Sequence, residues 1–334
     1  MMEEVELCFP QLNTSCWKTK RPLSVSVLIY IVLSFISLLT VTLNLLVIIS
    51  ISHFNILLSH VSRQLHTPTN LLLLSLGVSD FFVGFDMLFQ IMLINGCWLL
   101  GDLICSLYIV FDYVVTSTSI GIMVLISIDR YVAICDPLHY STRFTPRRVQ
   151  VCVSLCWILS LSYGIIVMKD DLKEPGRYKS CAGECGGTFT VIHQFLDFIV
   201  LFLLPIIVIV VLYMRVFVVA VSQARAMRSH IAAVSLQRSV KVTVKKSELK
   251  AAGTLGVVIV VFLICLFPYF CVTVTGQETF VSASSASFVL CLYDSNSCLN
   301  PLIYALFYPW FRKSIKLIFT LQILKPGSCE TNML

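Results

Sequence analysis

Seven long apolar runs constrain this chain more than any other feature of its sequence. A helix needs about 20 apolar residues to cross the hydrocarbon core of a bilayer. The runs lie near residues 24–52, 69–95, 103–134, 148–168, 192–220, 252–275 and 283–307. Of the 334 residues, 57% are apolar and only 13% are charged, which excludes an ordinary soluble domain. The sequence therefore predicts an all-α membrane protein, a seven-transmembrane helix bundle.

The rest of the chain is short and lies at the two ends of this bundle. We expect an extracellular N-terminus over residues 1–22, the transmembrane domain over 23–307, and a cytoplasmic segment over 308–334. The last segment should hold a short amphipathic helix after span 7, followed by a short tail. Residues 1–22 show no apolar stretch before a cleavage site, so the first span should act as its own membrane signal.

Basic residues near the span ends predict the orientation in the cell membrane. The loop after span 3 carries Arg143, Arg147 and Arg148, and the segment between spans 5 and 6 is also rich in Arg and Lys. In the loop between spans 4 and 5, acids and bases nearly cancel. We therefore expect the N-terminus outside and the C-terminus inside. Asn13, in an Asn-Thr-Ser triplet, is then a glycosylation acceptor on the outer side.

The cysteines divide between the outer side and the spans. The outer set is even in number and lies in an oxidising compartment, which allows fifteen disulfide pairings. It consists of Cys8, Cys16, Cys97, Cys105, Cys181 and Cys185. Cysteines in or near the spans are interpreted as small apolar packing groups. Cys329, beyond a basic amphipathic stretch, is a candidate palmitoylation site.

One acidic residue, Asp112, lies in an apolar run whose residues 106–128 carry no other charge. An ionisable side chain at membrane depth costs roughly 2.5 to 3.5 kcal/mol on insertion scales and indicates a functional site by default. We therefore expect Asp112 to hold a cation. The alternative is a carboxylate satisfied by neighbouring hydroxyl groups.

Several single-residue landmarks occur in order on the expected spans. They are Asp80 in span 2, Asp129-Arg130-Tyr131 at the end of span 3, Trp157 in span 4, Pro205 in span 5, Pro268 in span 6 and Asn300-Pro301-Leu302-Ile303-Tyr304 at the end of span 7. With these landmarks the chain resembles the rhodopsin-like G-protein-coupled receptors. Residues 296–311 are similar to the fingerprint of trace amine-associated receptors, most of all the fish olfactory members. The resemblance runs from about Leu7 to about Pro326.

This resemblance implies an olfactory receptor for biogenic amines that raises cAMP through a stimulatory or olfactory-type G protein. Its partners would be an amine with one or more ammonium groups, the heterotrimeric G protein and membrane lipid, without nucleic acid and without enzymatic catalysis. In amine receptors the position of Asp112 holds the ligand ammonium. We expect Thr116 beside it, with Tyr113, Tyr269 and Phe270 adding cation–π contacts.

Two further acids extend the expected site. Because packed helices lie about 8–10 Å apart, Asp112 and Asp197 on span 5 could hold both ends of a short alkyl diamine. In fish members this second acid resembles the determinant for diamine odorants. Asp294 stands where amine receptors carry a Tyr and opsins their retinal lysine, which excludes an opsin. It should lie beside Asp112, and one of two close carboxylates carries a proton unless a cation lies between them.

The expected ligand is therefore a diamine such as cadaverine or putrescine, or a longer polyamine, and a monoamine is the alternative. Asp197 also has a plainer interpretation, as an acid near the interface that reaches water. Asp86, in the outer half of span 2, is either a further ligand group or a structural, misoriented one.

The family's switch residues fall on the inner half of the spans. Arg130 and Glu248 correspond to a pair that ties spans 3 and 6 in the resting state, although a solvated helix end would also explain Glu248. Ile120, Pro205 and Phe262 match the core transmission triad, for which plain packing is the alternative. The expected coupling set also contains Asp129, Tyr131, Tyr213, Asn300, Pro301 and Tyr304.

Asp80, Ser119, Asn296 and Asn300 correspond to the family's sodium pocket. A buried carboxylate needs a partner, and hard oxygen ligands suit Na⁺. The alternative is simple hydrogen bonding to the two Asn side chains. No cofactor other than this allosteric sodium ion is expected.

For the outer cysteines, the resemblance favours a Cys105–Cys185 disulfide between the start of span 3 and the loop after span 4. It would tie the N-terminal cysteines as Cys8–Cys181 and Cys16–Cys97. These bonds would hold a lid over the ligand entrance.

The chain departs from the family pattern at two places. The Trp of the span 6 Cys-Trp-x-Pro motif is Leu266, for which Phe267 or Phe270 would have to compensate. Residues 55–62 are an apolar insertion in a loop that is normally short and basic. It is either real, with consequences for G-protein coupling, or an error of the gene prediction.

Two other classes of function compete with a receptor. An amine transporter would show repeat symmetry and broken helices at the midplane, and neither is evident in the sequence. A membrane-embedded enzyme would need a metal cluster or a nucleophile–base pair. No His-x-x-x-His, Gly-x-Ser-x-Gly or paired Cys/His set lies within a span.

Overall fold

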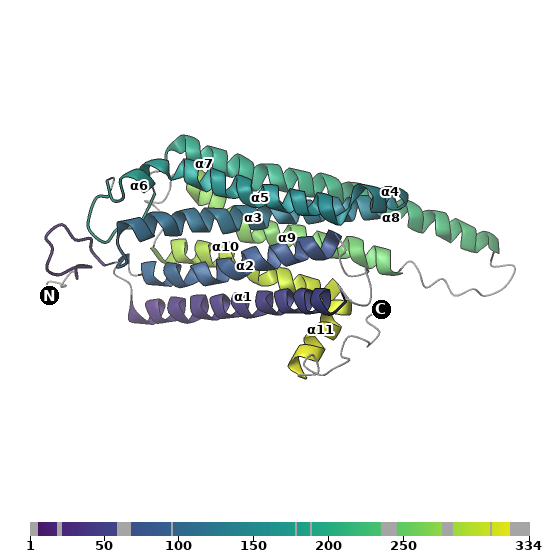
Figure 1. Cartoon of the computed structure of the whole chain (residues 1–334), viewed down its shortest axis with the longest axis horizontal. Helices are drawn as coiled ribbons and strands as arrows, with labels where there is room; N and C mark the ends of the chain where they lie inside the picture. Colours follow the sequence, from purple (N-terminus) through teal and green to yellow (C-terminus); the bar gives the residue numbers. More distant parts are fainter. Residues whose placement is uncertain are drawn as a thin grey trace.

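The chain is all-α in a computed structural model that describes residues 6–18, 22–58, 68–94, 96–177, 179–187, 189–234, 246–275, 283–307 and 309–320. The long helices run side by side along one axis (Figure 1). They are α1 (Leu23–Leu58), α2 (Pro68–Leu93), α3 (Asp102–Cys135), α5 (Pro146–Val167), the consecutive α7 (Val191–Asp197), η1 (Phe198–Leu203) and α8 (Leu204–Val234), then α9 (Lys246–Thr275) and α10 (Ala283–Phe307). This order confirms the predicted seven-transmembrane bundle.

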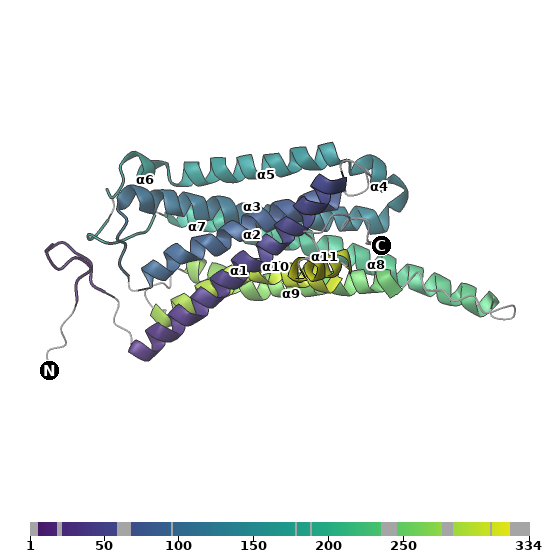
Figure 2. The ribbon, with the colours of Figure 1, turned by 60° about the horizontal axis from the view of Figure 1, so that its bottom comes forward.

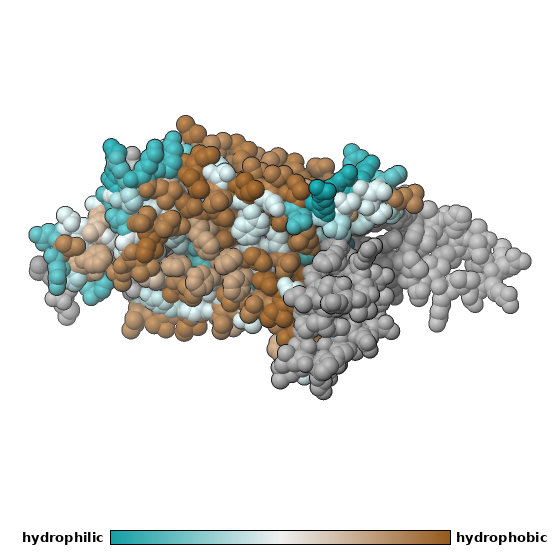
Figure 3. Space-filling model, in the orientation of Figure 1, coloured by the Kyte–Doolittle hydropathy of each residue, from teal (hydrophilic) through white to brown (hydrophobic). Residues whose placement is uncertain are grey.

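The surface of the bundle matches a membrane environment. Five helical segments among the described residues are long and apolar enough to cross a bilayer: Leu23–Ser52, Pro68–Leu93, Asp102–Cys135, Pro146–Val167 and Val191–Val219. Val260–Val274 in α9 is a shorter apolar stretch. Apolar side chains cover the middle of the visible face, and hydrophilic ones gather toward its two ends (Figure 3). Exposed apolar side chains of this extent on a bundle are expected to contact lipid.

Three short helices lie at the ends of the bundle: α4 (Pro137–Arg143), α6 (Lys169–Lys173) and α11 (Pro309–Phe319). The last is the amphipathic helix expected after span 7, and it turns across the bundle axis (Figure 2). Its Phe311 is buried against Val47 and Ile51 of α1, while Arg312 and Lys313 are exposed. The apolar face therefore docks on α1 and the basic face does not.

The fifth span changes its helical geometry directly after Asp197. Residues 198–203 form a π-helical turn, and the Leu204 N–H donates to the Ile199 carbonyl, five residues back. Pro205 follows and has no N–H to donate to the carbonyl of residue 201, which favours a locally wider turn. A π turn rotates the residues on either side of it relative to each other, so it helps to set the direction in which Asp197 points.

The main apolar core lies where α2, α3, η1, α8 and α9 meet. Ile120, Phe262 and Leu266 pack in this core with Phe202 and Phe270. Leu266 is 1% exposed, whereas Phe267 is 52% exposed and faces outward. The volume that a Trp ring would need is therefore filled by Leu266 together with Phe270, whose ring lies 5.2 Å from that of Phe202.

The apolar insertion at residues 55–62 begins inside α1 and extends beyond its end. Residues 55–58 continue α1 as helix, and residues 59–62 lie outside the described part of the chain.

Candidate functional site

A cavity of about 230 Å³ lies inside the bundle near the end that holds the N-terminus. Its wall includes six of the seven predicted ligand-binding residues: Asp112, Tyr113, Thr116, Asp197, Tyr269 and Phe270. The seventh, Asp294, does not line this cavity. The remaining wall comes from residues that the sequence did not single out as ligand contacts: Ile109, Cys185, Gly186, Gly187, Phe189, Gln194, Leu201, Thr273 and Tyr293.

Asp112 stands on α3 in the wall of this cavity. Its Oδ1 accepts a hydrogen bond from Thr116 Oγ1, one turn along the helix, at 3.3 Å. That bond is long, and a hydroxyl group does not neutralise a carboxylate. None of the ion pairs among the described residues involves Asp112, so its charge is not compensated by a described base.

Asp197, at the end of α7, lines the same cavity and is held by two tyrosines. The Tyr113 hydroxyl from α3 donates to its Oδ2 at 2.6 Å, and the Tyr163 hydroxyl from α5 donates to its Oδ1 at 2.5 Å. Asp197 is partly buried and has no ion pair among the described residues, although His193, one helical turn earlier, interacts with it electrostatically. The two phenols orient the carboxylate and leave its charge in place.

Asp294 and Asp86 lie behind Asp112 and away from the cavity. Asp294 on α10 is 2% exposed, and its Oδ1 accepts from Gln90 Nε2 at 3.4 Å. Asp86 on α2 is 1% exposed and faces inward, where it interacts electrostatically with Asp112 and Asp294. Asp86 therefore belongs to the acidic group of the bundle, and Asp294 lies close to Asp112 as expected.

Aromatic rings close the other sides of the cavity. The rings of Tyr269 and Tyr293 lie 4.4 Å apart, and Phe270 packs edge-on against Tyr269. On the far side, Phe189 lies 6.0 Å from Tyr113. Such faces attract cations. Tyr293, which sequence reasoning missed, directly precedes Asp294 in the chain. That adjacency was the signal in the sequence that could have placed Tyr293 near the ligand site.

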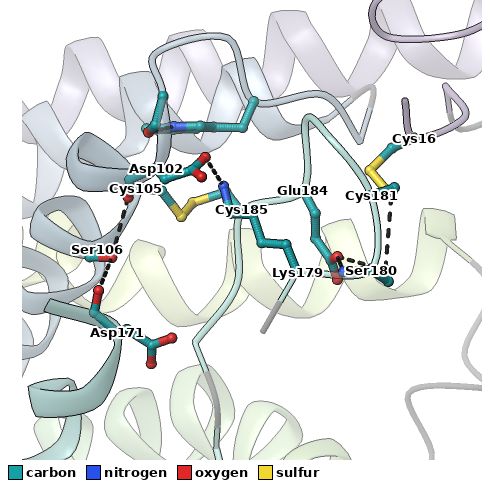
Figure 4. Close-up of polar contacts among 12 residues, drawn as sticks. Cys16, Asp102, Cys105, Ser106, Asp171, Lys179, Ser180, Cys181, Glu184 and Cys185 are labelled. Atoms are coloured by element: carbon teal, nitrogen blue, oxygen red, sulfur yellow. Dashed lines mark hydrogen bonds and ion pairs between the residues drawn. A yellow bond between two sulfur atoms is a disulfide. The ribbon is translucent and has the colours of Figure 1, made fainter. Parts of the chain in front are cut away.

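Two segments lie at this end of the bundle, and together we call them the lid: the N-terminal hairpin of residues 7–17 and the loop of residues 179–187. The expected Cys105–Cys185 disulfide joins α3 to the loop and brings Cys185 and the two following glycines to the cavity wall (Figure 4). The Lys179 ammonium pairs with Asp102 at the start of α3 at 2.5 Å.

The predicted pairing of the N-terminal cysteines was wrong. The structure joins Cys16 to Cys181 and Cys8 to Cys97, the reverse of the expected partners. The backbone explains this arrangement, because the Cys16 N–H donates to the Ala182 carbonyl at 2.9 Å and so holds Cys16 beside Cys181. Cys8, across the hairpin, is then left beside Cys97.

Glu184 stabilises the loop of the lid locally. It accepts hydrogen bonds from the Ser180 hydroxyl at 2.7 Å and from the Ser180 N–H at 2.8 Å. These bonds to its charged form hold the pKa of the Glu184 carboxyl below its usual value. Asn13, the candidate glycosylation residue, is exposed in the hairpin.

A polar network lies at the opposite end of α3. Buried Asp129 accepts from the Tyr140 hydroxyl at 2.7 Å and from Thr69 Oγ1 at 3.0 Å, and it forms an ion pair with Arg130. Tyr213 on α8 is hydrogen-bonded to Ser127 at 3.1 Å. Tyr131 is half-buried. The side chains of Glu248 and Tyr304 lie outside the described part of the structure.

Two of the three proposed transmission residues share one core. Ile120 and Phe262 belong to the same buried cluster, whereas Pro205 is buried in α8 but is not part of that cluster. Asn300 and Pro301 of α10 are both buried.

Asp80 is fully buried between α2, α3 and α10. Its Oδ1 accepts from Ser119 Oγ at 2.7 Å, and its Oδ2 accepts from Asn300 Nδ2 at 2.8 Å. Asn296 donates instead to Met123 Sδ at 3.7 Å, and its buried Oδ1 has no hydrogen-bond partner in the part of the chain that the structure describes. Ser119 and Asn296 also line a small cavity of about 10 Å³, about the volume that one water needs.

Comparison with known proteins agrees with this arrangement. The 7 transmembrane receptor (rhodopsin family) profile matches residues 44–304. Trace amine-associated receptor 8a of Rattus norvegicus is 38% identical over 98% of this chain and 96% of its own length. Trace amine-associated receptor 13c of Danio rerio is 37% identical over the same shares. Trace amine-associated receptor 7e of Mus musculus is 37% identical over 98% of this chain and 92% of its own.

Proposed function

Since the chain belongs to the trace amine-associated receptors of the rhodopsin-like G-protein-coupled receptor family, we propose that its ligand is an alkyl diamine or polyamine. In this proposal Asp112 binds one ammonium group and Asp197 binds the other. The receptor then acts through a stimulatory or olfactory-type G protein and raises cAMP.

The observation that carries the proposal is that Asp112 and Asp197 line the same cavity from different helices. Buried charges in proteins are paired or coordinate ions, and neither carboxylate has an ion-pair partner among the described residues. A ligand with an ammonium group at each end supplies both missing charges. A monoamine supplies one of them and leaves the other carboxylate with hydroxyl partners alone.

The size and lining of the cavity favour a small aliphatic chain. Ligand sites for drug-sized molecules are typically about 300–1,000 Å³, and this cavity of about 230 Å³ is smaller. The same wall carries apolar and aromatic groups, including Leu201 and Phe270, which suit methylene groups. Tyr113 and Tyr269 present aromatic faces, worth roughly 0.5 to 2 kcal/mol to a nearby cation.

The orientation of the chain follows the same proposal. The three disulfides and exposed Asn13 lie at the end of the bundle with the N-terminus, which we place outside the cell, where disulfides persist. The opposite end carries the Asp129–Arg130 pair and the basic loop after α3. We place that end in the cytoplasm, where it would contact the G protein. Arg130 and Glu248 are the proposed switch pair, and glycosylation at Asn13 belongs to the proposal as well.

The Asp80 region is suited to an allosteric sodium ion. Asp80, Ser119, Asn296 and Asn300 offer oxygen ligands, and the buried Asn296 Oδ1 has no other partner among the described residues. Sodium bound there would add a hard cation to the fully buried carboxylate. Replacing external NaCl by an equal concentration of N-methyl-D-glucamine chloride should raise amine potency in wild type and leave it unchanged in Asp80→Asn. Equal responses in both salts would contradict sodium binding.

The amine proposal is tested by measuring cAMP in cells transfected with the receptor. The ligands are alkyl diamines of graded length and monoamines of the same lengths. We expect diamines to be more potent than matched monoamines, and Asp112→Ala to abolish both responses. The matched control is Asp170→Ala, at an exposed acid of α6 that does not line the cavity. Full diamine responses in surface-expressed Asp112→Ala would refute the assignment, and a fall in cAMP would indicate an inhibitory G protein instead.

A further inference from the structure

The acidic group behind the cavity contains a carboxylate that the diamine proposal does not use. Asp86 is 1% exposed, and neither of its oxygens has a hydrogen-bond partner among the described residues. Buried polar groups are almost always hydrogen-bonded, and buried charges are paired. A carboxylate buried in this way without a partner in the protein indicates that a ligand group binds there.

Asp294 is a second buried carboxylate that supports the same inference. Among the described residues, its buried Oδ2 has no hydrogen-bond partner and its Oδ1 has only the 3.4 Å hydrogen bond from Gln90. Asp86 interacts electrostatically with both Asp294 and Asp112, so carboxylates from α2, α3 and α10 converge. None of them takes part in an ion pair with a described Lys, Arg or His.

The converging carboxylates lie next to the main cavity. Thr116 and Tyr293 line that cavity and also the small cavity of about 10 Å³ whose wall includes Asp294. The two side chains are thus shared between the amine site and the region of Asp294. Tyr108, stacked on Trp98 at 5.5 Å, interacts electrostatically with Asp86, Asp112 and Asp294 and adds an aromatic face beside them. A cation that reached this region would meet carboxylates and aromatic rings.

We propose that Asp86 and Asp294 form a cation subsite behind Asp112 that binds the third nitrogen of a linear triamine. The inference rests on the proposed amine function and extends it. A triamine such as spermidine would place one nitrogen at Asp197, one at Asp112 and one between Asp86 and Asp294. A diamine fills the first two positions and leaves the third without a cation. The third nitrogen would pass beside Tyr293 and Thr116, whose side chains line both spaces.

The test compares spermidine with cadaverine on wild type, Asp86→Asn, Asp86→Glu and the control Asp170→Asn. Loss of one charge-assisted contact weakens binding about tenfold or more. We expect Asp86→Asn to lower spermidine potency at least about tenfold more than cadaverine potency. Asp86→Glu, which keeps the charge, should retain most of the spermidine preference, and Asp170→Asn should match wild type.

A binding readout without signalling separates ligand contact from a structural role. Purified receptor is heated with and without spermidine or cadaverine, and its unfolding temperature is measured. Spermidine should stabilise wild type more than cadaverine does, and that difference should vanish in Asp86→Asn. Equal losses for both amines, or an unchanged difference, would overturn the proposal. A sodium control gives a further outcome that would overturn the proposal. If NaCl stabilises ligand-free wild type but not Asp86→Asn, and the difference between the two amines is the same in both, the subsite holds sodium and not an amine nitrogen.

The outcomes also separate this inference from the proposed function. If no amine activates or stabilises wild type, the amine function itself fails. If cadaverine acts through Asp112 and Asp197 but Asp86→Asn does not discriminate between the two amines, the function stands and only the third subsite is refuted.

Discussion

The proposed two-ended site predicts that Asp197→Asn removes any preference for diamines over monoamines of the same length. The substitution keeps the size of the side chain and removes its charge. In the wild-type protein the Asp197 carboxylate accepts hydrogen bonds from the hydroxyl groups of Tyr113 at 2.6 Å and Tyr163 at 2.5 Å. The amide oxygen of Asn can still accept one of these two hydrogen bonds. The position of the side chain should therefore change little, while its attraction for an ammonium group is lost.

The magnitude follows from the kind of contact that is removed. A hydrogen bond to a charged group contributes about 1.5 to 3 kcal/mol, and each 1.4 kcal/mol corresponds to about a tenfold change in affinity. Diamine potency should fall about 10- to 150-fold. The monoamine of equal length makes its ammonium contact at Asp112 alone, so its potency should change less than about threefold.

The assay is the cAMP dose–response for each amine pair, supported by competition binding on the same membranes. Comparing two ligands in each variant cancels changes in surface expression and G-protein coupling. Asp197→Glu, which keeps the charge on a longer side chain, is the control and should retain a diamine preference. Parallel loss of diamine and monoamine potency in Asp197→Asn would refute the two-ended site, since the residue would then act on the pocket as a whole.

Three further predictions concern the frame of the site. Leu266→Trp should lower the free energy of unfolding by about 1–3 kcal/mol, because it overfills a core in which Leu266 is 1% exposed; thermal unfolding of purified receptor measures this. Non-reducing peptide mapping should recover Cys16 linked to Cys181, and any other partner would contradict the backbone pairing of the lid. Tyr140→Phe should cost about 1–3 kcal/mol by removing a 2.7 Å hydrogen bond to buried Asp129, with Leu138→Ala, at an exposed residue of α4, as the control in the same melting assay.

The sequence predicted the bundle well, because each span has to satisfy its backbone internally and be apolar over about 20 residues. It also placed Asp112 and Asp197 in one cavity, since both are charged residues in runs where charge is costly. Asp86 was ambiguous. Its distance along α2 is known from the sequence, but the direction of its side chain depends on how α2 packs against α3 and α10.

Some contacts between distant segments were beyond sequence reasoning. The partner of Cys16 depends on a hydrogen bond between the hairpin and Ala182, and six cysteines with free loops allow many pairings. Tyr163 reaches Asp197 from α5, a helix with no acidic or basic residue in its membrane portion to draw attention to it. Such contacts arise from helix packing, which local periodicity does not specify.

The proposed two-ended site also implies a physical reason why a monoamine would bind less well than a diamine. Leaving a buried charge without its partner costs more than an ordinary lost contact, because the desolvated group keeps its penalty. An amine with one ammonium group can compensate Asp112 and would leave Asp197 with phenol partners only. Its disadvantage then comes from the carboxylate that stays uncompensated as much as from the contact that it fails to make. Discrimination should therefore follow the number of ligand charges, and adding methylene groups to a monoamine should not restore the potency of a diamine.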